Sequence, residues 1–373
     1  MMRNAISKSI SAGILAFFLL LTACGSNSSG TESSASPPNA ASPSPTTAAA
    51  EPQSTLGPPD KVNFAYFPAF HTMVVFVADK GGFFTEQNLD VNMIYTDKGS
   101  LLPTLLISGD ADISTVDITS IANAQAQGKE LLHLFPTSQN MSMNFVADNS
   151  FLAANGVTAD SPLEDRLAVL GKMKIGITGP ASPTDIYTRF LLTKAGYNPD
   201  DISLITLTNA GNLLAALKSR QIDGFMLTPP TPNQPELEGY GTIIVKSSAG
   251  EIAELANYPY QGITVMKAWA EEHPDTAARF VKALLQASDF IRANPEEAKG
   301  LLKEYFPDMD DAALEAGMND MIPSLPVDGL LTEDFVSKYL TLNKEIGILD
   351  LPELPSAAEG VLWTNEFVKK AGE

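Results

Sequence analysis

The sequence predicts an α/β protein with two lobes, a ligand cleft between them and a helical C-terminal part. Three observations carry this prediction. Strand-like and helical stretches alternate from residue 61 onward, the alternation restarts at residue 174, and the chain becomes almost entirely helical after residue 266. Strands that are regularly separated by helices pair in parallel through right-handed crossovers. Ligands of such sheets bind beyond the carboxyl ends of the strands, which places the predicted cleft.

The first alternation predicts the larger lobe. Its strands are expected at 62–67, 89–95 and 111–116, with helices at 72–80, 101–108 and 118–127. Apolar side chains at every second position, Leu89, Val91 and Met93, indicate the strand at 89–95.

The second alternation predicts a smaller, inserted lobe. Its strands are expected at 174–178, 202–208, 224–227 and 242–245, with helices at 183–195 and 213–219. We therefore divide the folded chain into a first lobe of residues 60–146 and 250–373 and a second lobe of residues 147–249. The segments 143–147 and 250–261 are interpreted as crossing strands or hinges. After a strand at 263–266, helices are expected at 275–293, 295–305, 310–321, 332–346 and 357–371.

Residues 1–23 have the pattern of an export signal. Arg3 and Lys8 precede an apolar run from Ile10 to Leu21, which is too short for a bilayer core that needs about 20 apolar residues. Leu21-Thr22-Ala23-Cys24 resembles a bacterial lipobox, in which the cysteine is lipidated and the residues before it are removed. Cys24 is the only cysteine of the chain. We therefore expect a lipid-anchored chain outside the cytoplasm, at the cell membrane of a bacterium. The alternative is a cysteine that follows an ordinary signal peptide.

Composition restricts the partners. Residues 24–59 consist mainly of Ser, Thr, Ala, Pro and Gly, which predicts a disordered tether after the lipidated cysteine. The chain has 24 Lys and Arg against 44 Asp and Glu, a formal net charge of −20. This charge argues against nucleic acid as a partner, because phosphate binding needs an excess of basic residues. It also argues against attachment to anionic lipid by charge, which leaves acyl chains as the membrane anchor.

The segment from Lys174 to Asp185 contains the densest signal. A strand ends at Thr178, a Gly-Pro turn follows, Ser182 is a good N-cap, and Asp185 completes a capping box. Two interpretations stay open. The segment is either a well-capped helix with no further role, or a helix start whose amides and hydroxyls face the cleft and bind an anion or polar group.

Residues 176–185 resemble the second-lobe entry of the nitrate/sulfonate/taurine-type solute-binding proteins of ABC importers. This superfamily includes thiamine-pyrimidine-synthase-like proteins. Gly82-Phe83-Phe84 followed by Leu89-Asp90-Val91 is similar to the family's junction between a helix and the second strand. Residues 105–113 resemble the loop before its third strand, and residues 214–224 repeat that unit. The resemblance spans residues 61–300 and implies a periplasmic-binding-protein-like fold of type II.

The resemblance also implies a cleft lined by the loops after successive strands. The residues expected to bind ligand there are Phe67, Phe70, His71, Gly99, Ser100, Thr115, Asp117, Asn140, Ser182, Thr184, Asp185, Asn209, Asn212 and Thr228. Asp117 is alternatively the N-cap of the following helix. Phe67, Phe70, Tyr187 and Tyr260 form either an aromatic surface for the ligand or part of the core.

Enzyme motifs do not occur in the sequence. It has no Gly-x-Ser-x-Gly elbow, no phosphate-binding P-loop and no His-Glu-x-x-His. The three histidines, His71, His133 and His273, do not lie at metal-ligand spacing. We expect His133 in the core, and no catalytic residue, metal or cofactor.

The resemblance implies a receptor whose two lobes close on a small molecule and deliver it to the permease subunits of an ABC importer. The ligand class stays open between a nitrate-, sulfonate- or taurine-like anion and a pyrimidine-like heterocycle. Family frequency favours the anion slightly, whereas the predicted cleft loops are short of basic residues, with Lys98 the nearest. The alternative functions are an exported enzyme acting on a small metabolite and a ligand-sensing domain of a signalling system.

Overall fold

The computed structural model describes residues 57–373. The predicted signal peptide, Cys24 and the predicted tether up to residue 56 lie outside these residues. Over the described range, no helix has both the length and the apolar character needed to cross a membrane.

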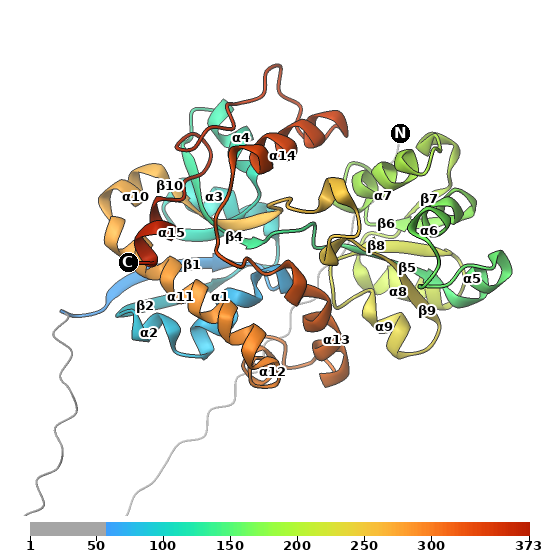
Figure 1. The fold of residues 1–373 in the computed structure, drawn as a ribbon, viewed down its shortest axis with the longest axis horizontal. Helices are drawn as coiled ribbons and strands as arrows, with labels where there is room; N and C mark the ends of the chain where they lie inside the picture. The colour runs from blue at the N-terminus through green and yellow to red at the C-terminus, as the bar shows by residue number, and fades with distance from the viewer. Residues whose placement is uncertain (1–56) are drawn as a thin grey trace, which may run out of the picture. The chain divides into compact units, whose positions relative to one another are not determined.

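Two five-stranded sheets form the framework (Figure 1). The first has the order β2-β1-β3-β10-β4, with β1 at Asp60–Tyr66, β2 at Leu89–Tyr95, β3 at Ile113–Val116, β4 at Leu131–Ser138 and β10 at Gln261–Met266. The second has the order β7-β6-β8-β5-β9, with β5 at Asn144–Asp148, β6 at Ile175–Ile177, β7 at Leu204–Thr206, β8 at Gly224–Leu227 and β9 at Gly241–Lys246. The chain therefore leaves the first sheet after β4, builds the second and returns at β10.

The strand directions are mixed. β1 pairs in parallel with β2 and β3, and β6 with β7 and β8, as predicted from the alternation with helices. β10 and β5 run antiparallel to both of their neighbours, so the expectation of parallel pairing is wrong for these two strands. Each is the first strand after the chain passes from one sheet to the other, and an antiparallel neighbour needs no helical crossover. The crossing strand predicted at 143–147 is therefore an inner strand of the second sheet.

Helices lie around both sheets. Those before the return strand are α1 at Met73–Lys80, α2 at Phe83–Glu86, α3 at Leu102–Ser108, α4 at Ile118–Ala126, α5 at Asn149–Asn155, α6 at Leu163–Ala168, α7 at Pro183–Lys194, α8 at Ala210–Lys218 and α9 at Asn233–Leu237. Those after it are α10 at Lys267–Glu272, α11 at Pro274–Ala293, α12 at Pro295–Lys303, α13 at Asp311–Met321, α14 at Glu333–Glu345 and α15 at Glu366–Ala371. The C-terminal part is thus mainly helical, as predicted.

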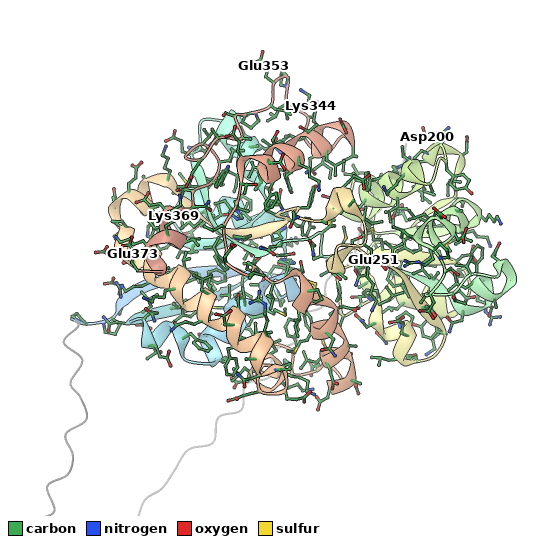
Figure 2. All side chains as sticks on the ribbon, in the orientation of Figure 1. Asp200, Glu251, Lys344, Glu353, Lys369 and Glu373 are labelled. Carbon is green, nitrogen blue, oxygen red and sulfur yellow. The ribbon has the colours of Figure 1, made fainter. Side chains whose placement is uncertain are left out.

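The core of the first sheet is built around α11. This helix packs against α1, α2, α12 and α15. Its Phe280 stacks on Phe64 of β1 and on Phe84 of α2, with ring centroids 5.9 and 4.7 Å apart. Charged side chains such as Asp200, Lys344 and Glu353 project outward from the ribbon (Figure 2), so much of the excess charge is solvated.

One predicted segment differs from the structure, and another is resolved in more detail. The helix expected at 357–371 is helical only in α15, because Leu362 and Thr364 hydrogen-bond to His133 of β4 instead. Trp363 and His133 form a parallel bridge, so this segment extends along the edge of the first sheet. The segment 250–261 contains a 3₁₀ turn at Ala253–Leu255 and becomes a strand only at Gln261.

Candidate functional site

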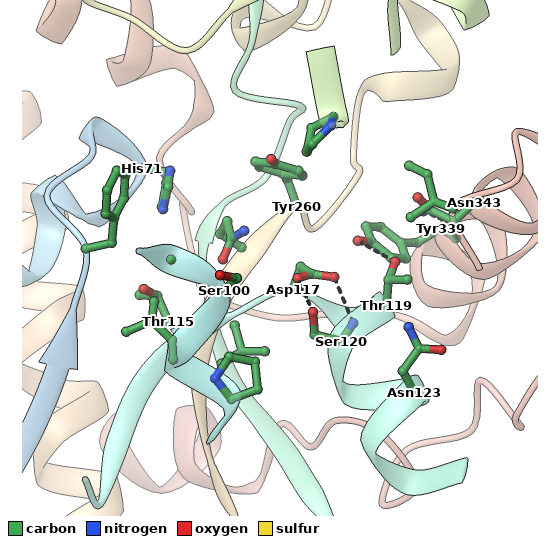
Figure 3. A pocket seen from close by; sticks show the side chains of 18 of the residues that line it. His71, Ser100, Thr115, Asp117, Thr119, Ser120, Asn123, Tyr260, Tyr339 and Asn343 are labelled. Atoms are coloured by element: carbon green, nitrogen blue, oxygen red, sulfur yellow. Dashed lines mark hydrogen bonds between the residues drawn. The ribbon is translucent and has the colours of Figure 1, made fainter. Parts of the chain in front are cut away.

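A cavity of about 410 Å³ lies where strands β1, β3 and β10 meet at one edge of the first sheet. β10 is antiparallel to β3, with Gly262 opposite Val116, so the start of β10 lies beside the end of β3. The walls of the cavity come from the loops after β1 and β3, the start of β10, α4, the start of α7, and α14 (Figure 3). Its volume is within the usual range for small-molecule sites.

Part of the predicted ligand set lines this cavity. Phe67, His71, Gly99, Ser100, Thr115 and Asp117 are all lining residues. Tyr187 and Tyr260, predicted as possible parts of an aromatic surface, line it too. Most of these residues lie at or just after the carboxyl ends of the parallel strands β1, β2 and β3, as the rule for α/β sheets requires. Tyr260 directly precedes β10, and Tyr187 lies in α7.

Other predicted residues are placed elsewhere. Phe70 is 1% exposed and packs edge-on against Phe306, with ring centroids 5.0 Å apart. It is therefore a core residue and not part of the cavity surface. Asn140 hydrogen-bonds Ser248 and Asn257 in the segments that connect the sheets. Asn209 caps α8 by accepting from the amide of Asn212 at 2.9 Å. The remaining predicted residues outside the cavity lining are Ser182, Thr184, Asp185 and Thr228.

Asp117 is the N-cap of α4, which is one of the two roles that the sequence left open, and it also lines the cavity. Its carboxylate accepts the Ser120 amide at 2.8 Å and the Ser120 hydroxyl at 2.6 Å, which caps α4. The same carboxylate faces the cavity below Tyr260 (Figure 3). It is the only charged side chain among the lining residues, and Lys98 is not one of them.

A cluster of tyrosines borders the cavity. Tyr187 and Tyr258 share a hydrogen bond of 2.8 Å between their hydroxyls, and Tyr339 accepts one from Thr119 at 3.0 Å. Burial, together with the neighbouring tyrosines, raises the pKa of Tyr187. Burial and then the Asp117 carboxylate raise the pKa of Tyr260 and of Tyr339. These hydroxyls are therefore protonated at neutral pH and can donate hydrogen bonds.

Two polar atoms beside the cavity have no hydrogen-bond partner within residues 57–373. They are Nδ1 of His71 and Oγ1 of Thr115. Burial lowers the pKa of His71 to about 4, so the imidazole is neutral at pH 7. Buried polar atoms are normally satisfied, so unpartnered ones at a cavity wall are candidates for ligand contact.

The start of α7 is capped as predicted, with one difference. The amide of Asp185 donates to Oγ of Ser182 at 3.3 Å. The Asp185 carboxylate does not return to the Ser182 amide, as a capping box requires. It accepts from the amide of Ala181 at 2.8 Å and from Arg189 at 2.7 Å.

Several lining residues were missed in the sequence. Thr119, Ser120 and Asn123 form a polar face on α4, and their helical spacing was a usable local signal. Tyr339 and Asn343 come from α14, more than 200 positions after β3 in the chain. No local pattern links α14 to this cavity. Among the described residues, no three His, Cys, Asp or Glu side chains are grouped so that they could hold a metal ion.

The two sheets and the cavity define a protein of the periplasmic-binding-protein fold. The solved structure of the aliphatic sulphonate-binding protein SsuA from Escherichia coli matches with a TM-score of 0.64 at 14% identity, covering 83% of this chain and 99% of that one. The family model described as the NMT1-like family matches residues 56–303, and the chain belongs to this family. Both the predicted fold and the predicted family resemblance are thereby confirmed.

Two curated relatives are also similar. The putative binding protein YtlA of Bacillus subtilis is 26% identical over 250 residues, which are 65% of this chain and 70% of the relative. The riboflavin-binding protein RibY of Chloroflexus aurantiacus is 25% identical over 377 residues, which are 97% of this chain and 92% of the relative.

Proposed function

We propose that this protein is a solute-binding receptor that delivers a small molecule to an ABC importer. The observation that carries the proposal is the cavity, which takes most of its walls from the first sheet and its C-terminal helices, but Pro183 and Tyr187 from α7 beside the second sheet. A ligand held by both parts stabilises the arrangement in which they are closed around it. The named binding proteins among the relatives and similar structures support the same role.

The test is binding without chemical change. A ligand that binds only the native state stabilises it by RT ln(1 + [L]/Kd), about 2.7 kcal/mol at a hundredfold excess over Kd. A thermal-shift screen of the full-length protein in detergent should therefore single out a ligand class. Mass spectrometry should recover that ligand unaltered after prolonged incubation. A stoichiometric product would favour the exported enzyme instead.

The lipid anchor and extracytoplasmic location belong to the same proposal. They rest on the Leu21-Thr22-Ala23-Cys24 pattern and on the charge of −20, which disfavours attachment to anionic lipid by charge. A tethered receptor has a raised effective concentration near its permease. Cys24→Ser should move the protein from the membrane fraction to the exported soluble fraction. Retention of this variant on membranes would contradict lipidation at Cys24.

A further inference from the structure

We propose that the ligand of this receptor is a flat nitrogen heterocycle without negative charge, held with an N–H or cationic nitrogen toward Asp117. The inference rests on the proposed receptor function and specifies its ligand class. It starts from the charges of the cavity wall. Asp117 is the only charged lining residue, so the wall has one carboxylate and no cation to balance an anionic ligand.

The two helix starts at the cavity do not supply the missing positive charge. The first turn of α4 is already capped by the Asp117 carboxylate. The first turn of α7 contains Asp185, whose carboxylate accepts from the amide of Ala181. A negative side chain in the first turn offsets the positive end of the helix dipole, which weakens both positions as anion sites. Arg189 of α7 is not a lining residue, and its guanidinium pairs with Asp185 and Asp200.

The aromatic residues of the wall fit a flat ligand. Phe67, Tyr187, Tyr260 and Tyr339 line the cavity, and Tyr260 lies between His71 and Tyr339 above Asp117 (Figure 3). His71 contacts Tyr260 edge to face, with ring centroids 6.3 Å apart. Aromatic faces stack on planar rings and attract cations, and neither interaction favours a small oxyanion.

The two unpartnered polar atoms beside the cavity are suited to hydrogen-bond the polar edge of such a ring. Thr115 lines the cavity and is 2% exposed, and its buried Oγ1 has no partner within residues 57–373. A hydroxyl both donates and accepts, and a neutral imidazole nitrogen does one or the other. Nδ1 of His71 and Oγ1 of Thr115 can therefore read ring nitrogens or carbonyl groups, while Asp117 accepts from an N–H group on another edge.

The experiment is a calorimetric titration of the full-length protein in detergent with defined probes. Riboflavin, thiamine and cytosine represent neutral and cationic heterocycles, and nitrate and methanesulfonate represent the anionic alternatives. We expect at least one heterocycle to bind at least a hundredfold more tightly than each anion. Asp117→Asn removes the charge but keeps an N-cap, because asparagine caps helices about as well as aspartate does. This variant should reduce the affinity for that heterocycle at least tenfold.

Matched variants separate ligand contact from folding. Asp148 caps α5 in the same manner, accepting from the amide of Phe151 at 2.9 Å, and is not a lining residue. Asp148→Asn should leave affinity within about threefold of the wild type. Thr115→Val should reduce the affinity for the heterocycle about tenfold, since it removes one hydrogen bond to the ligand. Thr188→Val removes another buried, unpartnered hydroxyl outside the cavity lining and should leave affinity unchanged.

The outcomes distinguish this inference from the receptor function. If only an anion binds tightly, the proposed ligand class is wrong, whereas the proposed receptor function is still supported. Heterocycle binding that is insensitive to Asp117→Asn overturns the assignment of Asp117. Failure of every probe to bind overturns the inference and also counts against the receptor function.

Discussion

His133 lies in β4 with both ring nitrogens buried and without a hydrogen-bond partner in the described part of the chain. Gly262 of β10 is its close neighbour, and a Cβ at that position would lie 1.8 Å from Cε1 of the imidazole. Only glycine therefore fits at position 262, beside this side chain. Burial lowers the pKa of His133 to about 3, so the folded protein holds it neutral.

This burial predicts a loss of stability in acid. An unfolded histidine binds a proton below its ordinary pKa of 6.5, whereas the folded His133 remains neutral down to about pH 3. The unfolded state therefore binds more protons in this window, and the free energy of unfolding falls as the pH falls, by up to about 1.4 kcal/mol per pH unit.

His133→Leu should reduce that slope. The variant removes the titrating group and two unpartnered nitrogens, so its stability at pH 7 should equal or exceed that of the wild type. Urea unfolding between pH 7 and pH 5 measures the difference between the two proteins, since the titration of the carboxylates is common to both. Parallel stability curves would contradict the role of His133.

At the level of the elements, the capped start of α7 links local stability to the cavity. Ser182 accepts from the amide of Asp185, and Pro183 and Tyr187 of this helix line the cavity. Ser182→Ala should cost about 1 kcal/mol of stability, the usual value for a lost N-cap. It should also weaken ligand binding, because the first turn of α7 then positions its residues less firmly.

A second cap provides the control. Asp310 accepts from the amide of Ala312 at 2.8 Å and begins α13, which has no residue in the cavity wall. Asp310→Ala should cost a similar free energy, about 1 kcal/mol, without altering affinity. Chemical unfolding and calorimetric titration of both variants would separate the two effects. Equal loss of affinity in both would mean that stability alone controls binding.

Local patterns predicted the elements that form from nearby residues. The strands β1, β2 and β3 and the caps at Asp117 and Ser182 follow from alternation and side-chain chemistry within a few residues. β4 was missed because its apolar run at 131–135 has no alternation, being buried on both faces. The predicted helix at 357–371 failed because pairing with the edge of β4 outweighed local helix preference.

The lining residues of the cavity likewise fall into those that local patterns predict and those that depend on tertiary packing. The carboxyl ends of β1 and β3 could be placed from the sheet rule, so Phe67, His71 and Thr115 were correctly expected near the cavity. Tyr339 and Asn343 depend on where α14 packs, and α14 contacts α4 only through tertiary structure. Sequence separation of this size leaves no signal in a single sequence.

On the scale of the whole molecule, Asp320 of α13 joins the C-terminal helices to the second sheet. Its carboxylate accepts from Lys246 at the end of β9 at 2.8 Å and from Asn233 of α9 at 2.6 Å. Asp320 is 7% exposed. Burial alone would lower the pKa of Lys246, but the Asp320 carboxylate raises it, so the Lys246 ammonium is charged at neutral pH.

Asp320→Ala should therefore destabilise the protein by about 2 kcal/mol, since it leaves Lys246 and Asn233 without their acceptor. The loss should be smaller than for a fully buried pair, because the side chain of Lys246 is 40% exposed. The side chain of Asp289 is 79% exposed and pairs with Arg292 at the surface, so Asp289→Ala should cost no more than about 0.5 kcal/mol. Equal unfolding free energies for the two variants would contradict a structural role for Asp320.

The start of the folded chain is the last feature at this scale. The amide of Asp60 donates to Asn88 at 3.2 Å, and its carboxylate accepts from Thr276 at 2.7 Å and pairs with Arg279. The carbonyl of Gly57 accepts from the side chain of Asn88 at 3.3 Å. Residues 57–60 therefore contribute contacts that a chain beginning at Lys61 would lack.

We expect a chain that begins at Gly57 to keep the stability and ligand affinity of the full-length protein. A chain that begins at Lys61 should be less stable by about 1 kcal/mol, mainly through the lost backbone hydrogen bond, since Asp60 is partly exposed. Thr276 and Arg279 lower the pKa of Asp60 below its ordinary 3.8, so its own contribution is present above that pH and is lost as the pH falls further. The difference between the two chains, measured by chemical unfolding, should therefore be largest at neutral pH and shrink in strong acid. Equal stabilities at pH 7 would mean that residues 57–60 do not contribute to the stability of the fold. Failure of both chains to fold would show that residues before Gly57 are required.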